Sequence, residues 1–277
     1  MVARCVPSHL RWAAVLFLTS GMTQWIVRAA TGSTSQNAPV LYFSIEKTWY
    51  GTPRNGPAYN FTIHQENNGE VPIYLEAPFY NEQETPRSTP MGGFLGLLNY
   101  EAFEMQFIGD GDQCLHIVVG PAGHYIIFLM YNEQLSMKDD LRMAYDSKVS
   151  YFPPYWKATI KIPLEYFPKN VKKFNAASRH GLRHRRSMDV LYVDAEPLPS
   201  HFTSPPFRTA QSINFEKVLL TYDNTKVSKV WERAIDEYRN APHDTSSPVT
   251  GSAYGGPLVG ALFLAYTSAY VAFIKYM

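Results

Sequence analysis

The chain is poor in cysteine, and its charges nearly cancel. Cys5 and Cys114 are the two cysteines among 277 residues. Because Cys5 lies in a segment that we expect to be removed, an intramolecular disulfide is excluded and stability must come from a hydrophobic core. Cys114 is expected to be a half-buried, unreactive thiol. Lys and Arg number 25 against 24 Asp and Glu, and this balance argues against nucleic acid as a partner.

Signatures of catalysis and of metal binding are also missing. No serine lies in a G-x-S-x-G motif. His116 and His124 lack the Cys/His spacing of a zinc site. Asp110-Gly111-Asp112 lacks the longer run of ligands of a calcium loop, so a plain hairpin turn is predicted there. We therefore expect no catalytic residues, no metal and no cofactor.

The first 29 residues predict a signal peptide. Basic Arg4 precedes the apolar run Trp12–Leu18, and Ala29 fits the residue before a cleavage site. An uncleaved signal-anchor helix is the alternative, but polar residues interrupt the run before it reaches the ~20 apolar residues that a span needs. Residues 30–39 follow as a polar linker.

Residues 257–277 form a hydrophobic tail behind a stalk, 241–256, that is rich in Ser, Thr, Gly and Pro. A lipid-anchor signal and a transmembrane helix both fit this pattern. Asp244 and the small residues after it resemble the attachment site of a lipid anchor, whereas the uncharged run is long enough to span a bilayer. Thr267 interrupts the run and favours the anchor, while Lys275 favours the helix. Either tail predicts a protein of the secretory pathway that is held at the cell surface or in another secretory membrane.

Residues 40–222 carry the alternation of apolar and polar side chains that is typical of β-strands with one face on a core. The alternation is clearest at residues 59–64, 73–77 and 156–162. Turn signals such as Asn68-Gly69 separate the strands. Many short strands with regular turns predict one all-β domain, an antiparallel β-sandwich of jelly-roll type.

Residues 223–240 change to helical spacing, with Asn224 or Thr225 placed to cap the helix. The apolar stripe consists of Val227, Val230, Trp231, Ala234, Ile235 and Tyr238. We expect a C-terminal helix that packs this stripe on the sandwich, and a partner-binding helix is the alternative.

A resemblance to a known family rests on three segments. They are IEKTWYGTP (Ile45–Pro53), IYLEAPFYN (Ile73–Asn81) and PLEYFPKNVKKFNAASRHG (Pro163–Gly181). They resemble an uncharacterised protein family whose human member is an open reading frame on chromosome 4, and the similarity covers about residues 42–222. That family has no established activity, so the resemblance adds little about function.

A more distant resemblance is to family 9 carbohydrate-binding modules and the related DOMON sandwiches. It rests on YEAFEMQFIGDGDQCLHIVVGPAGHY (Tyr100–Tyr125), WKATIKIPLEYF (Trp156–Phe167) and VKKFNAASRHG (Val171–Gly181). As in those modules, an acidic strand is followed by a hairpin, a Pro-x-Gly turn and a Trp-led strand that closes on Ile-Pro. The resemblance implies a carbohydrate-binding-module-like sandwich, and it makes a glycan the expected ligand.

Residues 101–120 predict a hairpin whose register can be stated. The apolar residues of its two strands share one face only if the loop has an odd number of residues and is centred on Gly111. Gln106 then lies opposite His116, with Glu104 diagonal to it, on the face turned away from the core. Such a trio can hydrogen-bond a sugar. An exposed polar face without a ligand, or a buried His–Glu pair between layers, is the alternative.

Three further features are candidates for recognition or modification. Trp49 lies at a strand end, where a loop could expose its ring for stacking on a sugar, whereas Trp156 alternates with core residues and is predicted to be structural. Asn60-Phe61-Thr62 is the one N-x-S/T sequon, so we predict a glycan on Asn60 in the secretory pathway. The basic cluster from Arg179 to Arg186 predicts a solvated loop, with a dibasic processing site as the alternative.

These observations together predict a non-catalytic binding module at the cell surface, with a glycan as the expected ligand and the membrane contacted through the tail. One alternative is a structural or protein-interaction ectodomain. A glycan-processing enzyme, whose two carboxylates would flank a cleft, is the third hypothesis.

Overall fold

The computed structural model describes residues 38–81, 92–131, 135–138, 141–181, 187–193, 204–223 and 225–240. The predicted leader, stalk, Asp244 and hydrophobic tail lie outside the described residues, as do residues 182–186 of the basic cluster. Within the described ranges, no helix is both long and apolar enough to cross a bilayer.

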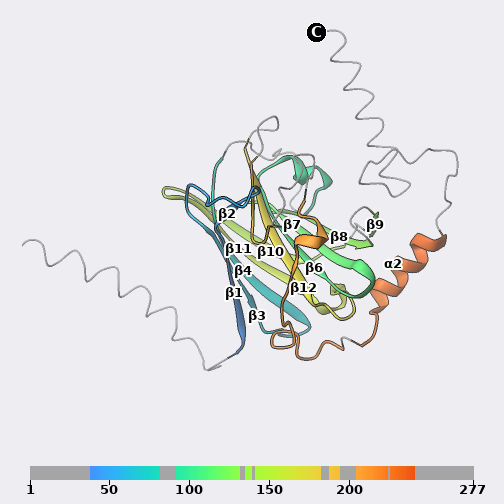
Figure 1. The fold of residues 1–277 in the computed structure, drawn as a ribbon. Helices are drawn as coiled ribbons and strands as arrows, with labels where there is room; N and C mark the ends of the chain where they lie inside the picture. Colours follow the sequence, from blue (N-terminus) through green and yellow to red (C-terminus); the bar gives the residue numbers. More distant parts are fainter. Residues whose placement is uncertain are drawn as a thin grey trace, which may run out of the picture. The chain divides into compact units, whose positions relative to one another are not determined.

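The described strands form two sheets (Figure 1). The five-stranded sheet has the order β1 (Val40–Ile45), β3 (Tyr59–His64), β4 (Glu70–Pro78), β11 (Pro154–Pro163) and β10 (Ala144–Tyr151), and all its pairs are antiparallel. The nine-stranded sheet has the order β2 (Lys47–Thr48), β13 (Ser187–Val190), β12 (Lys173–His180), β6 (Ala102–Ile108), β7 (Gln113–Val119), β8 (His124–Tyr131) and β5 (Gly92–Gly93).

Two short strands complete the second sheet, since β14 (Gln211–Ser212) pairs with β12 and β9 (Leu135–Lys138) pairs with β8. All its pairs are antiparallel except β5 with β8. The single-turn helices are η2 (Leu95–Asn99), η3 (Asp110–Asp112), η4 (Leu164–Tyr166) and η5 (Phe207–Thr209). The predicted fold class, an all-β antiparallel sandwich with a C-terminal helix, is confirmed.

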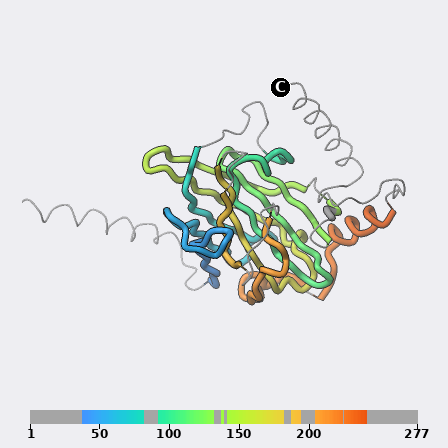
Figure 2. The backbone as a smooth tube through the Cα atoms, turned by 45° about the horizontal axis from the view of Figure 1, so that its top comes forward, coloured from blue at the N-terminus to red at the C-terminus, as the bar shows by residue number. Residues whose placement is uncertain are grey.

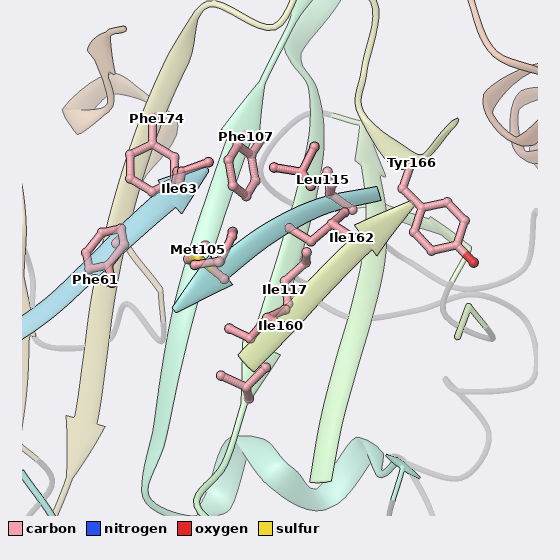
Figure 3. Packing of buried hydrophobic residues seen from close by; sticks show 14 of the residues in the cluster. Phe61, Ile63, Met105, Phe107, Leu115, Ile117, Ile160, Ile162, Tyr166 and Phe174 are labelled. Atoms are coloured by element: carbon pink, nitrogen blue, oxygen red, sulfur yellow. The ribbon is translucent and has the colours of Figure 1, made fainter. Parts of the chain in front are cut away.

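The core lies between the two sheets, where alternate side chains from both inner faces meet (Figure 3). Phe61 of β3 contacts Phe103 of β6 edge-to-face, with ring centroids 5.1 Å apart. The predicted inward sets on β3, β4 and β11 are buried, and Trp156 is among the largest fully buried side chains. The alternation in the sequence therefore assigned the inward face of these strands correctly, because each second side chain of a strand points to the same face.

The nine-stranded sheet is covered on its other face as well. A second apolar cluster includes Leu97 of η2, Cys114 and Val118 of β7, Phe128 of β8 and Phe207 of η5. Strands β6 and β8 are accordingly buried at almost every position rather than at every second one. The five-stranded sheet lacks such a cover among the described residues, so its outer face is the open one.

The β6–β7 hairpin has the predicted register. Phe107 pairs with Leu115, Met105 with Ile117 and Gln106 with His116, symmetrically about Gly111. Gly111 has φ of 62°, in the left-handed region that glycine adopts without steric cost. Asp110 in the same turn accepts hydrogen bonds from Asn170 at 3.0 Å and Lys172 at 2.9 Å. The segment is therefore the hairpin turn that the sequence predicts.

Helix α2 (Lys229–Asn240) lies beside the sandwich (Figure 2), next to β9 and η4. Trp231 and Ala234 are fully buried in the main core, and Nε1 of Trp231 donates to the carbonyl of Tyr166 at 2.9 Å. The stripe is thus part of the protein's own core, as expected. The predicted start was several residues too early: the side chain of Ser228, rather than Asn224 or Thr225, caps the helix by accepting from the backbone N–H of Trp231 at 3.3 Å.

Candidate functional site

The open face of the five-stranded sheet carries two rows of outward side chains that cross all five strands. Register fixes both rows, because residues paired across neighbouring strands point to the same face. The first row is Ser44, Asn60, Glu76, Lys157 and Lys148; the second is Tyr42, Thr62, Tyr74, Thr159 and Asp146. Each row takes one residue from each of β1, β3, β4, β11 and β10. The face therefore presents ten side chains from segments far apart in the sequence.

These rows line a groove of about 780 Å³. This volume lies within the range of ~300–1,000 Å³ that is usual for small-ligand sites. Tyr42 is 77% exposed and Tyr74 is 47% exposed, and both line the groove. They lie two strands apart, which corresponds to about 10 Å. The ring of Tyr74 rests edge-on against His64, with centroids 4.8 Å apart, so its orientation is supported from one side.

The charges in the groove balance. Glu76 and Lys157 form an ion pair at 2.6 Å, and the hydrogen bond from Lys157 to Glu76 raises the pKa of Lys157. Asp146 and Lys148 add one charge of each sign. A groove without net charge, but with donors and acceptors, is suited to a neutral ligand that has many hydroxyl groups.

Asn60, the asparagine of the predicted sequon, is one of the groove residues. Its side chain is exposed, while the intervening Phe61 is buried in the core. The predicted outward orientation of Asn60 is therefore correct. Its glycosylation stays a prediction.

The structure brings the predicted trio on the other sheet together but buries it. Nε2 of His116 lies 2.9 Å from Oε2 of Glu104, and Gln106 pairs with His116 across the hairpin. However, Glu104 and His116 are 1% exposed and Gln106 is 3% exposed. The expectation that this trio faces open solvent was wrong, because the apolar cluster around Leu97 and Phe207 covers that face of the sheet. The alternative from the sequence, a buried His–Glu pair between layers, describes the arrangement.

Two residues that the sequence analysis did not connect with this trio complete its network. Arg179 of β12 donates from Nη2 to Oε1 of Glu104 at 3.0 Å, and Ser204 donates to Oε2 at 2.8 Å. Burial alone would raise the pKa of Glu104, but the charge of Arg179 and the hydrogen bonds from His116 and Ser204 outweigh it and lower this pKa to about 2. Arg179 is buried rather than part of a solvated basic loop, since it pairs with this carboxylate.

Trp49 is also buried, at 5% exposure, and not displayed for stacking. It packs with Ala177 of β12 and Val190 of β13 in a small apolar cluster. The reason is that β2, directly before it, pairs with β13 at the edge of the nine-stranded sheet and holds the indole against that edge. The neighbouring Tyr50 is exposed instead.

A second polar cluster includes Tyr80 and His180, which lie in two of the segments that carry the resemblance to the chromosome 4 family. Nε of Arg54 donates to Oδ2 of Asp189 at 3.0 Å, and Nε2 of His180 lies 3.3 Å from the same oxygen. The rings of Tyr80 and His180 stack at 4.0 Å. The carboxylate of Glu101 accepts from the backbone N–H groups of Tyr80 and the following residue at 3.2 Å. The cluster ties the end of β4 to β12 and β13.

The described part of the chain holds no group of three or more His, Cys, Asp or Glu side chains that could bind a metal ion. Cys114 is buried beneath the cover of the nine-stranded sheet rather than half-buried. The tyrosines of the groove escaped sequence analysis because they occupy outward positions of alternating strands, where polar residues are expected. The signal in the sequence that could have indicated them is an aromatic residue at an outward position on each of two strands.

Two solved structures resemble this fold. A family 9 carbohydrate-binding module from Caldicellulosiruptor kristjanssonii in complex with glucose has a TM-score of 0.36 and 14% sequence identity, and covers 58% of this chain and 82% of that chain. The module from the same organism in complex with cellotriose has a TM-score of 0.35 and 14% identity, over 58% of this chain and 80% of that chain.

No family model matches the sequence. Individual proteins do. The human UPF0462 protein C4orf33 is 30% identical over 160 residues, which is 57% of this chain and 77% of that protein. Its homologue from Mus musculus is 32% identical over 160 residues, or 57% of this chain and 80% of that protein. The homologue from Danio rerio is 26% identical over 151 residues, which is 54% of this chain and 75% of that protein. With this identity over more than two thirds of the human and mouse proteins, the chain belongs to the UPF0462 family of C4orf33 proteins.

Proposed function

We propose that the chain is a non-catalytic binding module for neutral glycans and that the groove on the five-stranded sheet is its binding site. The observation that carries this proposal is the pair of exposed tyrosines, Tyr42 and Tyr74, in a groove that otherwise presents hydroxyl, amide and balanced charged groups. The apolar face of a sugar ring stacks on an aromatic ring, while its hydroxyl groups need donors and acceptors around it.

The spacing of the tyrosines supports a ligand longer than one sugar. Tyr42 and Tyr74 stand on either side of Thr62 in the same row. Two rings separated by two strand spacings can contact two different sugar units of one chain. Asn60 and Lys148 make no side-chain hydrogen bond to another described residue, so their polar groups are available to ligand hydroxyls. The balanced charges favour a neutral glycan over an acidic one.

A glycan array with the full chain, produced in bacteria so that Asn60 is unmodified, tests the proposal, followed by affinity measurements on each glycan that binds. We expect neutral oligosaccharides to bind, and Tyr42→Ala and Tyr74→Ala each to weaken binding at least about tenfold, which corresponds to ~1.4 kcal/mol. Tyr50→Ala is the matched control, because Tyr50 is exposed but does not line the groove. Binding that tolerates both groove substitutions, or no binding by folded protein, would refute the proposal.

The state of Glu76 supports binding rather than glycan processing in this groove. A glycosidase needs two carboxyl groups that flank the scissile bond. The carboxylate of Glu76 is already held by Lys157 at 2.6 Å, which suits a hydrogen-bond acceptor better than an acid that must carry a proton. We therefore expect bound oligosaccharides to be recovered intact after prolonged incubation, as checked by mass spectrometry.

A further inference from the structure

Asn60 is the second of the five residues in the first row of the groove. It lies on β3, between Ser44 of β1 and Glu76 of β4, which are its partners across the two neighbouring strands. Its side chain is exposed and makes no side-chain hydrogen bond to another described residue. The amide nitrogen is therefore free to carry a covalent substituent without any loss of structure.

Both tyrosines of the groove are diagonal neighbours of Asn60. Tyr42 lies two residues before Ser44, and Tyr74 lies two residues before Glu76. Diagonal neighbours across a strand pair are about 7–8 Å apart. A sugar attached to the amide of Asn60 consequently begins within the span of one sugar ring from each tyrosine, on the side from which a ligand approaches.

We infer that N-glycosylation of Asn60 closes the groove, so that an occupied sequon and a bound ligand are alternatives on one molecule. The inference rests on the proposed function of the groove. An attached glycan is present at the effective concentration of a short tether, in the millimolar range, whereas a free ligand must compete from solution. Modification of Asn60 thereby acts as an irreversible control of binding, set when the chain is made.

The test compares two hosts and two sequences. The full chain is produced in eukaryotic cells with an active secretory pathway and in bacteria, each as wild type and as Asn60→Gln. Glycopeptide mass spectrometry measures occupancy of Asn60. For each sequence, the affinity for the array glycans of the protein from eukaryotic cells is divided by that of the bacterial protein. Any effect of the substitution itself cancels in this ratio.

Nitration of Tyr42 and Tyr74 by tetranitromethane reports access to the groove without any ligand, with Tyr151 as the reference outside it.

We expect Asn60 to be occupied in the wild type from eukaryotic cells, and that protein to bind at least tenfold more weakly than the bacterial one. Asn60→Gln should show no difference between hosts. Nitration of Tyr42 and Tyr74 should fall at least threefold in the glycosylated protein, while Tyr151 is unchanged. An unoccupied sequon, or occupied protein with undiminished nitration and binding, overturns the inference. If the bacterial protein binds no glycan, the proposed function fails, and nitration still decides whether the glycan covers the groove.

Discussion

Nε2 of His116 lies 2.9 Å from Oε2 of Glu104, across neighbouring strands and inside the protein. A buried charge without a partner costs free energy, because water cannot reach it. Arg179 supplies the compensating positive charge at 3.0 Å from the other oxygen of Glu104. Three strands, β6, β7 and β12, are thereby joined through a single carboxylate.

This carboxylate should make the fold sensitive to acid. The pKa of Glu104 is lowered from 4.5 to about 2 in the folded chain. A group whose folded pKa is depressed stabilises the fold above its unfolded pKa, and this contribution disappears as the pH falls through the folded value. We expect the free energy of unfolding to drop by about 3 kcal/mol from this group between pH 5 and 2, as measured by urea denaturation at several pH values.

Glu104→Gln supplies the control for the acid effect. The substitution leaves the charge of Arg179 buried and uncompensated, so we expect a loss of about 3–5 kcal/mol at neutral pH. The variant should also have a shallower dependence of stability on pH below 5. If the free energy of unfolding of Glu104→Gln fell with pH below 5 as steeply as that of the wild type, other carboxylates would be the cause of the acid sensitivity.

Two glycines beside the β6–β7 turn should differ sharply in their tolerance of alanine. A Cβ on Gly109 would lie 2.2 Å from the backbone oxygen of Lys169, whereas a Cβ on Gly111 meets no atom within 4 Å. Gly111→Ala should therefore lower the free energy of unfolding by only about 1–2 kcal/mol, because alanine adopts the left-handed conformation less readily than glycine. Gly109→Ala should cost clearly more, because a backbone atom must move. Thermal unfolding of both variants compares them, and equal losses would contradict the contact at Gly109.

Trp231 should be the principal anchor of α2. Its side chain is fully buried and its indole N–H is bonded to the carbonyl of Tyr166. We expect Trp231→Ala to lower the free energy of unfolding by about 3–5 kcal/mol. Arg233→Ala, at an exposed position of the same helix, should change it by less than about 0.5 kcal/mol. Similar effects of the two substitutions would mean that the helix is not anchored through this stripe.

The two predictions for the C-terminal tail, which lies outside the described residues, can be separated by a tag placed after Met277. A lipid-anchor signal is cleaved, so the tag should be absent from surface protein, and phosphatidylinositol-specific phospholipase C should release the protein from intact cells. We expect this outcome, and the Asp244→Leu, Ser246→Leu double variant should then fail to reach the surface. Surface protein that retains the tag would instead establish a transmembrane helix.

Much of the fold could be predicted from local patterns. The inward residues of β3, β4 and β11 followed from alternation, because one face of the five-stranded sheet is open. The register at Gly111 followed from the requirement that apolar residues of both hairpin strands share a face. Both arguments use neighbouring positions only, and both were confirmed.

The cover on the nine-stranded sheet could not be predicted in this way. Glu104, Gln106 and His116 alternate with apolar residues and so resemble an exposed polar face. They are buried because η2, directly before β6, and η5, far along the chain from it, place Leu97 and Phe207 over them. Likewise, Arg179 belongs to a run of basic residues that is typical of a solvated loop, but its contact with Glu104 holds it inside the protein. Long-range packing decides such cases, and periodicity carries no information about it.

The alternation of β3, β4 and β11 divides each strand into inward positions that pack in the core and outward positions that line the groove. Inward positions such as Phe61, Leu75 and Ala158 are constrained by packing, whereas their immediate neighbours Thr62, Tyr74 and Thr159 point into the groove. Under the proposed function, the outward residues can therefore change ligand recognition while the packing of the scaffold stays intact. A library that randomises the outward positions alone should retain a high fraction of folded members and yield new ligand specificities, which makes this face a starting point for engineered binders.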